Sequence, residues 1–132
     1  MFGCSAVRPR DFGLRSGTLR PCPDSPNCVS SEAGTRTSQR VAPFGAHGGQ
    51  AEMTRLAALV EAWPRTAVIT NTRDYLHAES TSLVWRLVDD VEFRYDSVAG
   101  VIHVRSASWI GRGDLGVNRT RVEGMRKKWD AK

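Results

Sequence analysis

The chain has 132 residues, 40% of them hydrophobic and 25% charged, and its formal net charge at pH 7 is +5. This length and this ordinary apolar content fit one small globular domain with a single compact core. The positive charge does not indicate a nucleic-acid partner, because the basic residues are scattered and do not alternate with aromatic residues. The one basic cluster, at residues 126–128, falls in the last turn of an expected helix, where cations complement the helix dipole.

The first fifty residues are poor in large aliphatic side chains and rich in Gly, Pro, Ser and Arg. This composition predicts an extended arm over residues 1–50, followed by a packed domain over residues 51–132. Within the arm, Cys22 and Cys28 bracket two prolines and an asparagine, which favour a tight turn that could bring the two sulfur atoms together. The spacing fits a small loop disulfide and not a zinc knuckle, and two unpaired thiols in a reducing compartment remain the alternative.

A third cysteine, Cys4, stands in the run Phe-Gly-Cys-Ser at residues 2–5. This run resembles the end of a bacterial lipoprotein cleavage box whose hydrophobic part is missing, so one interpretation makes Cys4 a lipidated residue that associates the protein peripherally with a membrane. The other interpretation is an incidental N-terminal cysteine. Because the chain as given contains no apolar run long enough for a signal peptide or a membrane helix, we expect it to be soluble.

From Ala51 onward the sequence shows regular patterns. Five apolar residues recur at helical spacing before Pro64 and predict an amphipathic helix: Met53, Leu56, Ala57, Val60 and Trp63. Runs of β-branched or alternating residues then predict four strands, over residues 66–72, 75–82, 88–96 and 101–108. Asp114 can cap a last helix, and four residues share its apolar face: Asn118, Val122, Met125 and Trp129.

These elements predict an α+β fold. Sequential strands with short links favour antiparallel pairing, and two amphipathic helices can cover only one face of a small sheet. We therefore expect a small antiparallel sheet of about four strands, with an N-terminal and a C-terminal helix on one face, preceded by an extended arm rich in Pro and Gly.

The last two predicted strands also suggest a register. If Asp96 pairs with Val101, then Phe93 faces Val104 on one side of the hairpin and Glu92 faces Arg105 on the other. A shift by one residue would mix apolar and charged side chains on both faces. The favoured register predicts a left-handed turn at Gly100 and buries five residues: Val91, Phe93, Tyr95, Ile102 and Val104.

The polar sides of the strands provide six candidate ligand-binding residues: His77, Glu79, Asp90, Glu92, His103 and Arg105. Histidines with carboxylates could hold a divalent metal ion or transfer protons near neutral pH. A groove for a polar or anionic ligand anchored by Arg105 is a second interpretation, and a solvated outer face tied by salt bridges is the third. No catalytic or cofactor motif occurs in the sequence, so the catalytic residues stay unknown and no cofactor is predicted.

Five blocks of the sequence carry a resemblance to one family. They cover residues 19–31, which include the run Cys-Pro-Asp-Ser-Pro-Asn-Cys, and residues 75–79, 88–93, 102–108 and 114–119. Their order and sequence are similar to the bacterial and plastid family catalogued as domain of unknown function 1499 (DUF1499), over nearly the whole chain. The resemblance implies an exported or lipid-anchored protein, with an oxidised Cys22–Cys28 pair and Cys4 as the anchoring residue. The family name carries no activity.

Three functions are compatible with these observations. The leading hypothesis is a non-enzymatic envelope or periplasmic protein, a binding or accessory module whose partner is a protein or a polar or anionic small ligand. The alternative is a small metal-dependent or acid–base hydrolase that uses four residues of the polar face: His77, Glu79, Glu92 and His103. The third is an accessory subunit of a membrane complex, for which the arm would be ordered.

Overall fold

The structure, a computed structural model, describes residues 12–83, 86–109 and 116–131. Among these residues the main sheet has six strands, and its strand pairs are antiparallel. Five strands follow one another across the sheet: β3 (Cys28–Ser30), β8 (Val101–Ser108), β7 (Val88–Asp96), β6 (Tyr75–Thr81) and β5 (Thr66–Asn71). The sixth, β4 (Phe44–Gly45), also pairs with β8.

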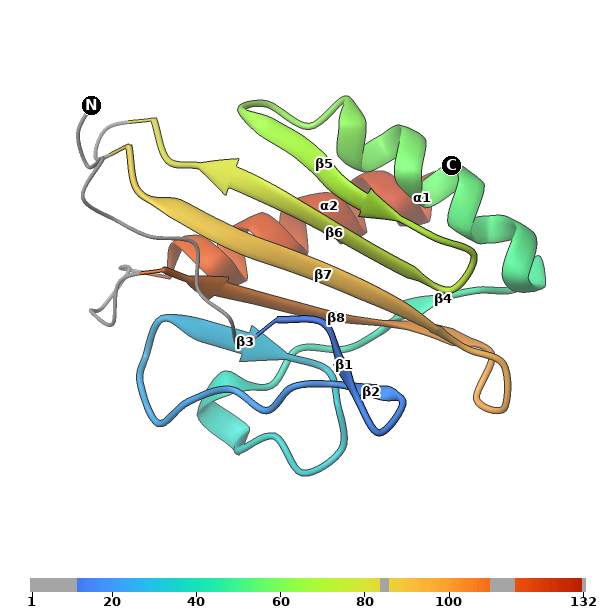
Figure 1. The fold of residues 1–132 in the computed structure, drawn as a ribbon, viewed down its shortest axis with the longest axis horizontal. Coiled ribbons are helices and arrows are strands. Elements are labelled where there is room, and N and C mark those ends of the chain that lie inside the picture. Colours follow the sequence, from blue (N-terminus) through green and yellow to red (C-terminus); the bar gives the residue numbers. More distant parts are fainter. Residues whose placement is uncertain (1–11, 84–85, 110–115, 132) are drawn as a thin grey trace.

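The remaining elements lie outside this sheet. A separate hairpin and two short 3-10 turns come from the first fifty-one residues: β1 (Leu14–Arg15), β2 (Thr18–Leu19), η1 (Thr37–Gln39) and η2 (Gly49–Ala51). Two helices complete the described chain: α1 (Glu52–Glu61) and α2 (Val117–Ala131). In Figure 1 the two helices lie on one side of the main sheet, and the β1–β2 hairpin lies beside β3 and β8. Neither helix is both long and apolar enough to span a bilayer.

The two helices cover one face of the sheet with an apolar core. Because side chains alternate along a strand, four fully buried residues share this face: Leu76, Val91, Phe93 and Val104. Six residues at helical spacing pack against them: Met53, Leu56 and Val60 of α1, and Val122, Met125 and Trp129 of α2. The indole N–H of Trp129 donates to the carbonyl of Gly45 at 2.9 Å, so its polar group is satisfied inside the core.

Several predictions from the sequence pattern are confirmed. The fold is α+β, and the four predicted strands are β5 to β8, with ends that differ by at most one residue. The predicted register of the β7–β8 hairpin is correct, since Phe93 pairs with Val104 and Glu92 with Arg105. Gly100 adopts the positive φ, 67°, that the turn requires. The apolar face predicted for the last helix is buried, whereas its expected cap, Asp114, lies outside the described residues.

The expected strand count of about four is wrong. Residues 12–50 add β3 and β4 to the main sheet and form the β1–β2 hairpin, so α1 follows four short strands and is not an N-terminal helix. Strands this short carry no periodicity: β1, β2 and β4 have two residues each, and all three residues of β3 are buried. Backbone pairing with β8 defines β3 and β4 instead.

We predict that Phe93→Ala lowers the free energy of unfolding by about 3–5 kcal/mol, because it leaves a cavity at the centre of the apolar core. The Phe93 side chain is fully buried, and its ring centroid lies 5.8 Å from that of Phe44. Urea denaturation measures the change. Val98→Ala is the control, because Val98 is 98% exposed at the hairpin tip and its truncation should leave the stability nearly unchanged. Equal stabilities for the two variants would contradict the assigned core face.

Candidate functional site

The candidate residues lie together on the sheet face that points away from the helices. Alternation along β6, β7 and β8 places all six there: His77, Glu79, Asp90, Glu92, His103 and Arg105. Direct cross-strand partners on this face are His77 with Glu92, Glu79 with Asp90, and Glu92 with Arg105. The expected sharing of one face is therefore present in the structure.

This polar face is covered by the N-terminal segment, which we define as residues 12–22. The ring of Phe12 stacks on His77 with a centroid separation of 4.5 Å. The backbone N–H of Gly13 donates to Glu92 Oε2 at 2.6 Å, and the carbonyl of Pro21 accepts a bond of 3.3 Å from Arg105 Nη2. His77 and Glu92 are fully buried and Arg105 is 1% exposed. Most of the expected outer face is therefore an internal polar layer.

Glu92 is the centre of this layer. Its Oε2 accepts a second bond, of 2.6 Å, from the hydroxyl of Tyr75, and its Oε1 accepts a bond of 3.2 Å from Arg105 Nη1. Burial, together with the negative charge of Glu92, raises the pKa of Tyr75 well above its ordinary value, so this phenol stays protonated and continues to donate. The predicted Glu92–Arg105 pair is present, and Arg105 uses its second Nη to hold the N-terminal segment rather than to fork onto Glu92.

Three of the six residues form a smaller cluster beside this centre. His77 Nε2 lies 2.6 Å from Asp90 Oδ1 in a buried hydrogen bond. One ligand atom each from His77, Asp90 and Glu79 lie within 4.8 Å of one another. Glu79 is the member of the cluster that solvent reaches, because its side chain is only partly buried. The combination of one imidazole and two carboxylates can hold a divalent cation or share a proton.

His103 belongs to a different part of the face. It lies on β8, separated from His77 on β6 by the intervening strand β7. Its Nδ1 lies 3.0 Å from Ser31 Oγ, and its Nε2 lies 3.3 Å from Asp96 Oδ2. The structure therefore does not bring the two candidate histidines into one site.

Glu32 is a further buried carboxylate of this face, and the sequence patterns did not single it out. It accepts a 2.9 Å bond from Arg94 Nη2 at one oxygen, and bonds from Arg94 Nε and the backbone N–H of Leu19 at the other. Burial by itself would raise the pKa of Glu32, but the bonds from Arg94 and Leu19 outweigh it and hold the pKa below its ordinary value. No local pattern relates Glu32 to Arg94, which lies 62 residues away in the chain.

A second polar network lies on the helix side, at the end of β8, and was also missed. Arg121 Nη2 lies 2.7 Å from Asp89 Oδ2, and the hydroxyl of Ser106 donates to Asn118 Oδ1 at 2.6 Å. All four side chains are buried. Helical spacing predicts Asn118 on the inner face of the last helix, but no sequence pattern indicates that strand residues meet it there with polar groups. This network ties α2 to β7 and β8.

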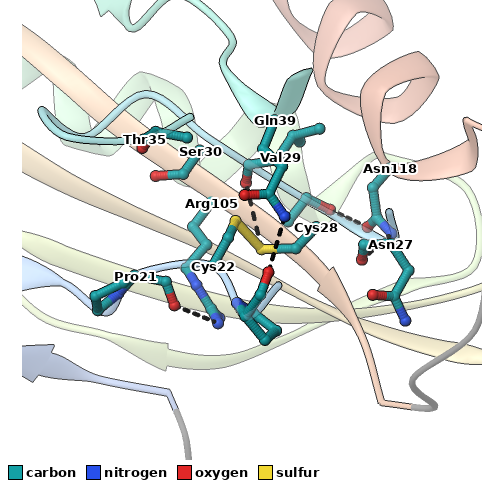
Figure 2. Close-up of a disulfide and its surroundings, with 12 residues drawn as sticks. Pro21, Cys22, Asn27, Cys28, Val29, Ser30, Thr35, Gln39, Arg105 and Asn118 are labelled. Carbon is teal, nitrogen blue, oxygen red and sulfur yellow. Dashed lines mark hydrogen bonds between the residues drawn. A yellow bond between two sulfur atoms is a disulfide. The ribbon is translucent and has the colours of Figure 1, made fainter. Parts of the chain in front are cut away.

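The disulfide between Cys22 and Cys28 is present, with a Cα–Cα distance of 5.7 Å. Figure 2 shows its loop held from two sides. Gln39 Nε2 donates to the carbonyls of Pro23 at 2.8 Å and Ser25 at 2.7 Å, and the carbonyl of Asn27 accepts a 3.1 Å bond from Asn118 Nδ2. The loop is therefore fixed to η1 and α2. Cys4, the other cysteine of interest, lies outside the described residues.

One end of the polar face opens into a hollow of about 560 Å³. Five of its lining residues carry polar side chains that matter here: Arg65, Glu79, Thr81, Ser82 and Arg86. Of the six candidate residues, Glu79 is the one that lines this hollow. Both arginines are exposed and have positive φ, 51° for Arg65 and 58° for Arg86, which is uncommon for residues other than glycine. Arg65 Nε donates to the carbonyl of Thr81 at 3.1 Å, which directs its guanidinium along this end of the sheet.

We predict that Arg105→Ala lowers the free energy of unfolding by about 3–5 kcal/mol, because it leaves the carboxylate of Glu92 buried without its cation. Arg73→Ala is the matched control, since the Arg73 side chain is 80% exposed. Urea denaturation of both variants gives the comparison. If Arg105→Ala were as stable as Arg73→Ala, the Glu92 network would not be structural, and Arg105 would be free to serve a ligand.

The lowered pKa of Glu32 predicts a loss of stability in acid. A carboxylate whose pKa is lower in the folded state stabilises the fold fully above its unfolded-state pKa, near 4.5, and loses this contribution as the pH falls through the folded-state value. Below pH 4.5 the stability of Glu32→Gln should therefore fall less steeply than that of the parent. Guanidinium titrations across the acid range measure both slopes, with Glu61→Gln, an exposed change on α1, as the control. Parallel slopes for parent and Glu32→Gln would refute the linkage.

Comparison with known proteins adds one finding. Residues 18–129 match the family model described as "Protein of unknown function (DUF1499)". Neither the curated proteins nor the solved structures contain a match to this chain. The matched region runs from β2 almost to the end of α2, so it includes the whole main sheet, the disulfide loop, α1 and most of α2. The resemblance carried by the five sequence blocks is therefore confirmed: the chain belongs to the DUF1499 family.

Proposed function

We propose that this protein is a non-enzymatic binding protein of the cell envelope, and that it takes a small anionic ligand in the hollow at the end of the polar face. The observation that carries this proposal is the lining of the hollow by the two exposed arginines, Arg65 and Arg86, together with the hydroxyl-bearing residues Thr81 and Ser82. Guanidinium groups pair with carboxylate, phosphate or sulfate oxygens through directed hydrogen bonds. A volume of about 560 Å³ lies within the range of small-molecule sites.

The candidate acid–base groups already make contacts within the protein, and this supports a non-enzymatic role. A general acid or base must reach the proton that it transfers. Glu92 is fully buried and already accepts three hydrogen bonds, and His77 lies beneath the ring of Phe12. A substrate the size of a small organic molecule could reach these two residues only after the N-terminal segment had left the sheet. The hydrolase alternative would need this displacement, whereas ligand binding in the hollow does not.

The envelope location has separate support. A disulfide such as Cys22–Cys28 persists in oxidising compartments and is rare in reducing ones. Lipidation at Cys4, the anchor that the family resemblance implies, would hold the protein at a membrane surface and leave the folded domain free to meet its ligand. The same arrangement would suit an accessory subunit of a membrane complex, for which the partner would be a protein.

The test is calorimetric titration with inorganic phosphate, sulfate and acetate. We expect the parent protein to bind at least one of these anions, and the Arg65→Ala/Arg86→Ala double variant to bind it about tenfold more weakly or worse, because charge-assisted hydrogen bonds are lost. Arg73→Ala removes an exposed guanidinium outside the hollow and should keep the parent affinity. An affinity that is the same in the parent and the double variant, or absent from the parent, overturns the proposal.

A further inference from the structure

Beyond anion binding, we infer that His77, Glu79 and Asp90 form a binding site for a divalent transition metal ion of the zinc type, reached through the hollow. These residues supply one imidazole nitrogen and two carboxylate oxygens, and the three ligand atoms lie within 4.8 Å of one another. A mixed nitrogen and oxygen donor set suits Zn²⁺ and similar ions better than Mg²⁺ or Ca²⁺, which prefer oxygen alone. Three protein ligands leave a fourth position for water or an anion.

The hydrogen bonding of the His77 imidazole is the second observation that supports the site. Its Nε2 is bonded to Asp90, and its Nδ1 is buried without a hydrogen-bond partner among the described residues. Buried polar atoms are nearly always paired, so an unpartnered nitrogen is unusual for an imidazole inside a folded domain. His77 therefore has more bonding capacity than its contacts with the described fold use.

The surroundings hold the imidazole in place for a ligand. Phe12 stacks on one side of the His77 ring, with an interplanar angle of 25°, and β6 carries the residue between its neighbours β5 and β7. His77 and Asp90 come from paired strands, and Glu79 is directly opposite Asp90, so the backbone register fixes the spacing of the cluster. A rigid scaffold of this kind reduces the reorganisation that metal binding requires.

The three residues differ in how far they are buried and in whether they line the hollow. His77 and Asp90 are 0% and 3% exposed, whereas Glu79 is partly exposed and lines the hollow. An ion entering from the hollow meets Glu79 first and the two buried ligands behind it.

The ligand set differs from the four residues that the sequence suggested for a metal-dependent or acid–base hydrolase: His77, Glu79, Glu92 and His103. Glu92 is excluded because its oxygens are taken by Tyr75, Gly13 and Arg105, and His103 is excluded because it lies on β8 with Ser31 and Asp96. Asp90 takes the place of both.

The experiment uses the full chain, treated with a chelator and then titrated with Zn²⁺ alone. The chain has three histidines, so a ¹⁵N spectrum of their side chains resolves each ring. We expect the ring nitrogens of His77 to shift on addition of Zn²⁺, while those of His47 and His103 stay unchanged. A shift confined to His47, which is exposed in a loop, or no shift at one equivalent, overturns the inference.

Variants give an independent measure by calorimetry. Glu79→Gln should weaken Zn²⁺ binding about tenfold or more, since it removes a charged ligand from the partly exposed side of the cluster, and Glu79→His should restore binding. Glu61→Gln and His47→Ala are matched controls that should keep the parent affinity. Parent affinity in Glu79→Gln overturns the inference. The Arg65→Ala/Arg86→Ala variant should still bind Zn²⁺, so failure of anion binding and failure of metal binding are told apart.

Discussion

A buried carboxylate on the central strand of the sheet is the constraint on which the rest of the structure depends. Glu92 is fully removed from water, and a buried charge costs free energy unless donors surround it. The donors come from three parts of the chain: Tyr75 on β6, Arg105 on β8 and the backbone of Gly13. The bond from Gly13 helps to hold the N-terminal segment, which is poor in aliphatic residues, on the sheet. Two apolar residues of the segment add to this attachment, since Leu19 is 2% exposed and the ring of Phe12 stacks on His77.

The disulfide helps to fix the N-terminal segment, which covers the polar face of the sheet. Cys22 follows Pro21, whose carbonyl accepts a bond from Arg105, and Cys28 begins β3, which pairs with β8. The cross-link therefore joins the end of the N-terminal segment to a strand of the main sheet, next to the cation that neutralises Glu92. Closing so short a loop removes less chain entropy than the roughly 3 kcal/mol expected for a loop of 15 residues, so the cross-link acts mainly by local ordering.

The difference between what could and could not be predicted from the sequence has a physical cause. Alternation along 88–96 and 101–108 predicts which side chains share a face. The register that pairs Phe93 with Val104 and Glu92 with Arg105 keeps apolar and charged side chains on separate faces. Alternation cannot tell what covers a face, so it leaves the polar side open to three interpretations: a metal or acid–base site, a groove for a ligand, and a solvated face. The segment that covers the polar face forms two-residue strands and is attached by single hydrogen bonds. The Glu32–Arg94 pair at this face joins residues that are 62 positions apart in the chain. Such features leave no periodic signal.

The N-terminal segment that covers the polar face also determines which of its residues solvent can reach. Over Glu92 and Arg105 it closes the polar face, and both residues are bonded to other parts of the described fold. Near the end of β6 and the start of β7, Glu79 is only partly buried. It lines the hollow that also contains the guanidinium groups of Arg65 and Arg86. In the part of the chain that the structure describes, Glu79 and the two guanidinium groups are therefore reached from the same hollow. Most of this strongly charged sheet face is therefore buried as a polar layer, held by paired charges and hydrogen bonds together with the contacts of Phe12 and Leu19. A small remainder of the face, at Glu79, is exposed to solvent.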